Sequence, residues 1–262
     1  MALNTLAIGL SEVGRRDNAL QHATEAVQLR RELAEQNPAA HNPGLAMALN
    51  TLAVRLSEVG RRDEALQHAT EAVQLRRELA EQNPAAHNPG LAMALNTLAV
   101  RLSEVGRRDE ALQPATEAAN LYRTLAEQNP TAYNPDLAGA LNNLAIGLSE
   151  VGRRDDALQP ATEAVQLRRT LAEQNPAAHN PNLATTLIVM ALRLAEADRS
   201  VEGVIAAREA LQLVLPTAQR YPAAFQGLAM SIARDYVQLC QQAEAEPDLD
   251  LLRQAAAILT EG

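Results

Sequence analysis

Residues 1–184 of this chain consist of four near-identical copies of one 46-residue unit. The copies begin at Met1, Met47, Met93 and Gly139, and the first two differ at only three positions. A fixed period of this length is typical of stacked helical repeats, in which each unit buries its apolar face against its neighbours. We therefore predict a solenoid whose apolar interior is a continuous strip rather than one globular core.

The composition fits a helical solenoid and narrows the classes of partner. Hydrophobic residues make up 47% of the 262 residues but aromatic residues only 2%, so Leu and Ala must supply the core. All cations are Arg and the net charge is −9, which disfavours nucleic acid and anionic membranes as partners. Cys240 is the only cysteine and no apolar run reaches 18 residues, so we predict no disulfide, no membrane span and a cytoplasmic location.

One repeat, residues 47–92, is predicted to form two helices. Apolar residues recur at helical spacing in both halves of the repeat. Gly60 lies between the halves and can adopt the positive φ that ends a helix. Pro84 disfavours helix in the residue before it, so the second helix should end near Asn83.

The segment that joins one repeat to the next is predicted to be a short loop over residues 84–89. Asn88 would be the N-cap of the following helix, and Pro89 would occupy its first position. Three histidines are then expected in this loop and its equivalents: His41, His87 and His179.

These positions resemble the tetratricopeptide repeat. The first helix of that repeat carries a large residue, then Leu and a small residue, then another large residue, here Leu49, Leu52-Ala53 and Leu56. Gly60 falls at the expected turn, and small residues follow on the second helix. The second helix and its loop are longer than in the 34-residue standard. The segment 140–145 is similar to the long-repeat subfamily found in kinesin light chains and many bacterial signalling proteins. HEAT repeats share the period, but the Leu-Ala…Gly…Ala spacing argues against them.

The resemblance implies an all-α fold, a right-handed superhelical solenoid of helix-turn-helix repeats. It also implies a protein–protein interaction scaffold that binds a peptide or protein segment in its concave groove. The alternative is a regulatory, sensor or self-assembly module of a larger bacterial signalling protein.

The repeat pattern changes after residue 184, and we predict three regions: 1–184, 185–229 and 230–262. The second is a divergent fifth repeat, in which Asp198 replaces the turn glycine. Pro216 falls inside its second helix and should kink or end that helix near Leu215. The third is predicted to hold capping helices, one running from Met230 through Gln242 and a final one after it.

The ends of the array suggest two further hypotheses. The extra apolar residues of the fifth repeat, Ile188 and Val189, are a candidate docking surface for another domain or for a second copy in a homo-oligomer. The amino end lacks the Asn-Pro pair that precedes later repeats, so we expect a fragment of a longer array or a chain with a frayed start.

Candidate ligand-binding residues lie on the first helix of each repeat, which lines the concave face in tetratricopeptide arrays. Asn recurs there at Asn4, Asn50, Asn96 and Asn142, with Asn143 beside the last. An amide both donates and accepts hydrogen bonds, so these side chains could bind an extended peptide backbone. They could equally solvate the inner wall or bond a neighbouring helix. Arg55 and Arg101 could hold an anionic group or form only surface ion pairs.

Motifs that would indicate catalysis or a cofactor are missing from the sequence. It contains no Gly-rich phosphate loop, no Cys-x-x-Cys and no GxSxG nucleophile. His22 and Glu25 have a spacing that could bind metal, but Pro114 and Pro160 replace the histidine in later repeats. We predict no enzymatic activity, no cofactor and no metal site.

The predicted faces of the first helix can be tested by a pair of substitutions. Leu52→Asp should abolish cooperative folding of its hairpin, because a buried unpaired carboxylate costs several kcal/mol, on the order of 3 or more. Glu58→Ala on the polar side should change stability little. Thermal unfolding measures both, and equal melting temperatures would refute the assignment of faces.

Overall fold

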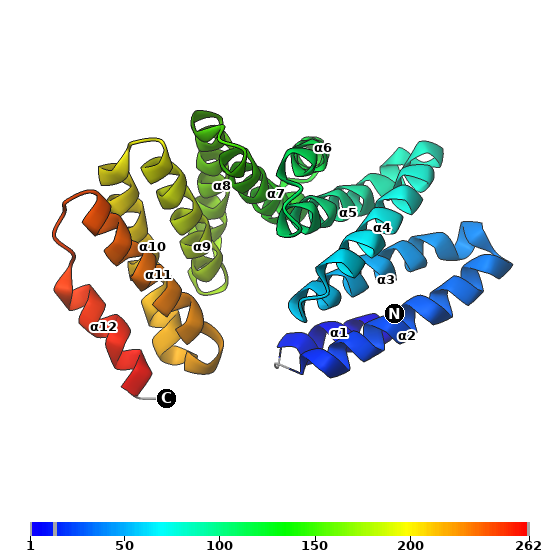
Figure 1. Cartoon of the computed structure of the whole chain (residues 1–262), viewed down its shortest axis with the longest axis horizontal. Helices are drawn as coiled ribbons and strands as arrows, with labels where there is room; N and C mark the ends of the chain where they lie inside the picture. The colour runs from blue at the N-terminus through cyan, green and yellow to red at the C-terminus, as the bar shows by residue number, and fades with distance from the viewer. Residues whose placement is uncertain (1, 13–14, 261–262) are drawn as a thin grey trace. The chain divides into compact units, whose positions relative to one another are not determined.

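The computed structural model describes residues 2–12 and 15–260. Along these residues the chain forms twelve α-helices and no strand (Figure 1). The helices are α1 (Ala2–Glu12), α2 (Arg16–Gln36), α3 (Pro38–Glu58), α4 (Arg62–Gln82), α5 (Pro84–Glu104), α6 (Arg108–Gln128), α7 (Pro130–Glu150), α8 (Arg154–Gln174), α9 (Pro176–Glu196), α10 (Ser200–Arg220), α11 (Pro222–Gln242) and α12 (Leu249–Thr260). Each odd-numbered helix, here called an A helix, packs against the even-numbered B helix that follows it. The predicted all-α solenoid of helical hairpins is confirmed.

The hairpins are grouped into two compact units, Met1–Gln128 and Asn129–Gly262. The first unit holds α1 to α6 and the second holds α7 to α12. Each unit is therefore a stack of three hairpins. The regions 1–184, 185–229 and 230–262 follow changes in the sequence pattern, and as domains they stay a prediction.

The joint between one hairpin and the next is helical, so the predicted loop over 84–89 is wrong. Asn83 is the N-cap of α5, and its side chain accepts a hydrogen bond from the backbone N–H of Ala86 at 3.3 Å. Pro84 occupies the first helical position, where its missing N–H costs nothing. Pro89 lies inside the helix and removes one intrahelical hydrogen bond. Starting five residues earlier adds more bonds than Pro89 removes. The histidines expected in the loop are helical for the same reason: His41, His87 and His179.

A residue in the left-handed conformation joins the A and B helices of most hairpins. Gly60, Gly106 and Gly152 have φ values of 82°, 82° and 81°. Asp198 takes the same place between α9 and α10 with φ 59°. Because its short polar side chain tolerates this conformation, the turn survives the loss of glycine.

The last hairpins are more regular than their sequence suggests. α10 runs through Pro216 to Arg220, so the expectation that this proline could end the helix near Leu215 is wrong. Leu215 and the next turn of α10 pack into the core of the second unit, which compensates for the hydrogen bond that Pro216 cannot make. α11 begins at Pro222, eight residues before the predicted start at Met230.

Alanine allows the A and B helices to approach closely. In the first unit Ala65, Ala69 and Ala72 on α4 have no exposed surface, and they face a layer that includes Leu49 and Leu52 of α3. In the second unit the equivalent alanines of α8 are also fully buried: Ala157, Ala161 and Ala164. Small side chains at the helix crossing bring the backbones together, and leucines fill the space at the edges.

Within each unit, A helices lie closer to one another than B helices do. α3 contacts both α1 and α5, and α9 contacts both α7 and α11. Among the described residues, α4 makes no comparable backbone contact with α2 or α6, nor α8 with α10, although α10 contacts α12. A close-packed layer backed by a spread layer curves toward the close-packed side. In the first unit the A helices therefore form the inner, more closely packed wall.

Arg76 ties three successive helices together. Its guanidinium donates a hydrogen bond from α4 to the carbonyl of Pro43 on α3 at 3.1 Å. It also lies against Gly90 of α5, where an added Cβ would come within 2.6 Å of the guanidinium. Burial lowers the pKa of Arg76. Sequence periodicity placed this arginine on a helix but did not indicate the bridge.

The turn glycines and a helical glycine should respond in opposite ways to alanine. Gly106→Ala is expected to destabilise the protein by about 1–2 kcal/mol, because alanine is strained at φ 82°. Gly139→Ala should stabilise it by about 0.5–1 kcal/mol, because Gly139 lies inside α7 and an added Cβ meets nothing within 4 Å. Urea unfolding followed by circular dichroism measures both changes. A shift of the same sign for the two variants would contradict the turn assignment.

Candidate functional site

The repeated asparagines lie at the contact between successive A helices, here called the A seam. In the second unit Asn142 of α7 donates its Nδ2 to Thr186 Oγ1 of α9 at 3.2 Å. Thr186 is only 1% exposed. Sequence reasoning missed it, although a threonine at a position that holds alanine in the earlier copies was a usable signal. The amide of Asn142 thus bonds a neighbouring helix, which was one of the two roles considered for it.

Three of the repeated asparagines have a carbonyl oxygen that is buried inside the protein. Asn4 and Asn50 are each 8% exposed, and their Oδ1 atoms, like that of Asn142, are buried without a hydrogen-bond partner. A buried unpaired polar atom costs about 1–3 kcal/mol. Asn96 is half-buried at the corresponding place on α5, and Asn143, next to Asn142 on α7, is half-buried too.

Arg55 and Arg101 lie in the A seam of the first unit rather than on its surface. Each pairs with the glutamate three residues later at 3.0 Å, and their side chains are only 11% and 10% exposed. Ser57 of α3 donates to Glu104 of α5 at 2.7 Å, which links the two helices. Burial lowers the pKa of Arg101, and the carboxylates of Glu104 and Glu58 oppose that shift. Between α3 and α5, two arginines balance two glutamates.

The second unit repeats the arrangement with one arginine fewer. Arg193 of α9 pairs with Glu196 at 2.9 Å, and Ser149 of α7 donates to the same carboxylate. Burial lowers the pKa of Arg193, and Glu196 and Glu150 oppose the shift. Gly147 stands where α3 and α5 have arginine, so one cation faces two carboxylates and this seam is acidic. Arg193 was missed as a candidate because the fifth repeat has drifted, but it falls 92 residues after Arg101, which is two repeat lengths.

The candidate docking pair Ile188 and Val189 offers little surface to a partner. Ile188 is 7% exposed and belongs to the core of the second unit, and Val189 is half-buried. Ile188 occupies the position that holds asparagine in the earlier repeats. At that position an apolar residue packs into the A seam rather than projecting from it.

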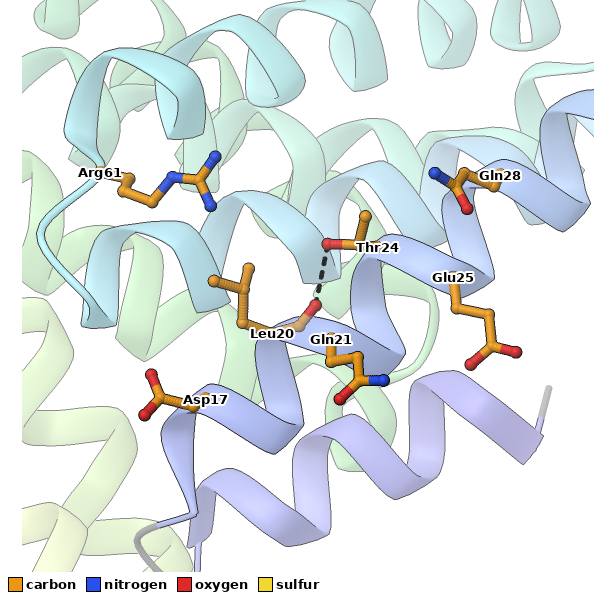
Figure 2. Close-up of a pocket in the computed structure, with 7 residues that line it drawn as sticks. All are labelled: Asp17, Leu20, Gln21, Thr24, Glu25, Gln28 and Arg61. Carbon is orange, nitrogen blue, oxygen red and sulfur yellow. Dashed lines mark hydrogen bonds between the residues drawn. The ribbon is translucent and has the colours of Figure 1, made fainter.

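The B helices carry shallow grooves lined by both polar and apolar side chains. Figure 2 shows the one on α2, with a volume of about 650 Å³, lined by six residues of that helix and by Arg61 from the turn before α4. Thr24 donates its hydroxyl hydrogen to the carbonyl of Leu20 at 2.9 Å, and Arg61 is paired with Glu64. Equivalent residues line grooves on α6 and α8. The groups in the α2 groove form no nucleophile–base pair.

Metal binding and membrane insertion find no support in the described residues. Within residues 2–12 and 15–260, no group of three His, Cys, Asp or Glu side chains could hold a metal ion. His22 and Glu25 lie 3.6 Å apart, but they form only a pair. Each helix in the part of the chain that the structure describes is too short or too polar to cross a bilayer.

The residue pattern and the geometry agree with a family comparison. The family model of the tetratricopeptide repeat matches four segments, residues 1–40, 45–86, 91–130 and 137–178. These segments cover more than half of the sequence, and the chain belongs to the tetratricopeptide repeat family. Proteins of this family generally mediate protein–protein interactions, and the fold is typically a non-enzymatic scaffold. No curated protein sequence matches the chain.

Solved structures with the same fold include relatives of kinesin light chains. BtubC (BKLC) from P. vanneervenii is 16% identical with a TM-score of 0.65, over 94% of this chain and 89% of that one. A kinesin light chain-like protein of Podosopora anserina with nearly identical TPR-like repeats is 15% identical with a TM-score of 0.62, over 84% of this chain and 97% of that one. At these identities the likeness concerns the fold, and there it confirms the predicted resemblance.

The ion pairs of the A seam should matter more than those on the surface. Arg101→Ala is expected to cost about 1–3 kcal/mol of unfolding free energy, because it leaves the carboxylate of Glu104 without its ion-pair partner. Arg107→Ala is the matched control. Its pair with Glu110 is exposed, so its loss should leave stability unchanged within error. Chemical denaturation of both variants decides the point, and equal losses would argue against a structural role for the seam.

Proposed function

We propose that this chain is an interaction scaffold that binds an extended peptide or protein segment along the concave wall of its A helices. The observation that carries the proposal is the recurrence of asparagine at one position of the A helices, where Asn96 and Asn142 remain partly exposed. An extended backbone offers N–H and C=O groups at regular intervals, and a side-chain amide can pair with both. Binding of this kind depends on the ligand backbone more than on its sequence.

The near-identity of the repeats supports a ligand that is itself regular. In the first unit Asn50 and Asn96 occupy equivalent positions on α3 and α5, so they offer the same subsite twice. A segment of varied sequence would gain little from identical subsites. A segment that has a repetitive sequence, or that binds through its backbone, makes the same contact at each hairpin.

The charged residues of the seam set which ligands the wall favours. Arg55 and Arg101 remain in the proposed site, but they act by balancing the glutamates rather than by presenting free cations. The second unit has one arginine for two carboxylates, Glu150 and Glu196. A ligand that meets this second seam is therefore expected to carry a basic or neutral side chain there. The net charge of −9 likewise argues against nucleic acid.

The alternative function, a regulatory or self-assembly module working through Ile188 and Val189, has less support. Ile188 is buried, so a partner could not reach it without opening the core. The single cysteine, Cys240, is buried and free, which supports a reducing compartment such as the cytoplasm.

The proposal predicts that removing the amides of the first unit weakens ligand binding. A peptide selected from a displayed library of random 12-residue segments serves as the probe, and calorimetry measures its affinity for the full chain. Asn50→Ala combined with Asn96→Ala should weaken binding by about 5-fold to 150-fold, because each lost hydrogen bond contributes about 0.5–1.5 kcal/mol. Adjacent sites on one ligand need not add.

Asn120→Ala supplies the matched control, because Asn120 is exposed on the B helix α6. It should leave the affinity unchanged. An unchanged affinity for the double variant, with its fold verified by circular dichroism, would move the site away from the A seam. A library that yields no binder to the full chain would count against peptide binding altogether.

A further inference from the structure

Ion pairs cross from one B helix to the next in the first unit. On α2 the guanidinium of Arg31 donates to both carboxylate oxygens of Glu71 on α4, at 2.6 and 2.8 Å. Arg77 of α4 donates to one carboxylate oxygen of Glu117 on α6 at 2.5 Å. In both cases the two residues are 40 positions apart in sequence. We call these two ion pairs the B straps.

The B straps cross a gap that the helix backbones leave open. Among the described residues, no Cα atom of α4 lies within 8 Å of a Cα atom of α2 or α6. The A helices differ, because α3 comes within that distance of both α1 and α5. In the first unit neighbouring hairpins therefore meet backbone to backbone on the inner wall, whereas long charged side chains span the distance between the B helices.

The second unit keeps a link of this kind even where the repeat sequence has changed. Arg169 of α8 pairs with Glu209 of α10 at 2.7 Å, at the positions that the B straps use. In α10 the position of the arginine is taken by Leu215, which is buried in the core. Arg208 of α10 instead pairs with Asp248, just before α12, and again 40 positions away. The link is thus present although its usual arginine is absent, which argues that joining neighbouring B helices matters to the array.

The B straps are exposed enough for dissolved salt to weaken them. The side chains of Arg31 and Glu71 are 47% and 37% exposed, and those of Arg77 and Glu117 are 44% and 29% exposed. Salt screens such pairs, because charges interact over about 30 Å at 0.01 M salt but over only about 3 Å at 1 M. Exposed pairs also add little to stability, so they can open without unfolding the helices that carry them.

We propose that the B straps are a salt-sensitive device that sets the spacing of the B helices in the first unit. At low ionic strength the straps hold α2, α4 and α6 at the spacing seen in the structure. At high ionic strength the straps open and the B helices move apart, with the contacts between A helices as the hinge. The inner wall bends with this movement, so ionic strength controls its curvature. This device belongs to the stack itself and does not depend on peptide binding.

Pulsed electron paramagnetic resonance on the full chain measures the spacing directly. Spin labels on Gln36→Cys and Gln82→Cys report on the ends of α2 and α4, where both side chains are exposed. Cys240→Ala removes the only native cysteine from the background. Between about 0.01 and 1 M NaCl the distance between the labels should grow by about 1–2 Å. Screening of the net charge of −9 acts in the opposite direction, because it weakens the repulsion between helices.

Two variants of the first strap make the measurement specific. Arg31→Gln should give the longer distance already at low salt and remove most of the salt dependence. Exchanging the charges, with Arg31→Glu and Glu71→Arg together, should restore the shorter distance at low salt, because the pair can form again. Arg107→Gln is the matched control, because it loses the same charge but its partner Glu110 lies three residues away rather than on a neighbouring B helix. It should leave the distance and its salt dependence unchanged.

A distance that stays constant or shortens as salt is added would overturn the proposal. So would a charge exchange that leaves the labels at the longer distance. Equal effects of Arg31→Gln and Arg107→Gln would overturn it too, since the change would then follow net charge rather than the strap. Circular dichroism of each variant verifies that its helices are intact, so that a change in distance reports on the spacing of folded helices.

Discussion

The close contact between A and B helices at alanine side chains is the constraint on which the rest of this structure depends. Ala65, Ala69 and Ala72 have no exposed surface, and their small size sets the distance between the paired backbones. The B helices α2, α6 and α8 repeat this contact with buried alanines of their own. In the first unit the stack places A helices closer together than B helices, and so separates an inner wall from an outer one.

The inner wall shows how a polar seam can be part of a helical stack. Arg101 is buried between Glu58 and Glu104, and Ser57 links neighbouring A helices through the second of these carboxylates. Buried charges are tolerated when they are paired, whereas an unpaired polar atom raises the free energy. The amide oxygen of Asn50 is such an atom. The seam therefore pairs its charges, but the Nε atoms of Arg55 and Arg101, like the amide oxygen of Asn50, are buried without a hydrogen-bond partner.

The fifth repeat differs from the earlier ones in opposite ways on its A helix and on its B helix. On the A helix, Ile188 replaces asparagine and becomes core, so the change removes a polar group from the seam. On the B helix, Val201 and Ile205 replace aspartate and glutamine and remain exposed. More hydrophobic residues thus remove a polar group from the A seam and add exposed apolar side chains to α10.

The sequence by itself determined the helical repeat, the faces of its helices and the family, because period and apolar spacing report directly on which residues must be buried. It did not determine which of two Asn-Pro pairs starts a helix. Asn83 and Asn88 have the same capping chemistry, and only the extra backbone bonds gained from the earlier start decide between them. Nor could it tell that Ile188 is buried while Val201 is exposed, or that Arg193 joins a charged seam. Those differences depend on which helix faces a neighbour across the stack, and only the tertiary structure sets that contact.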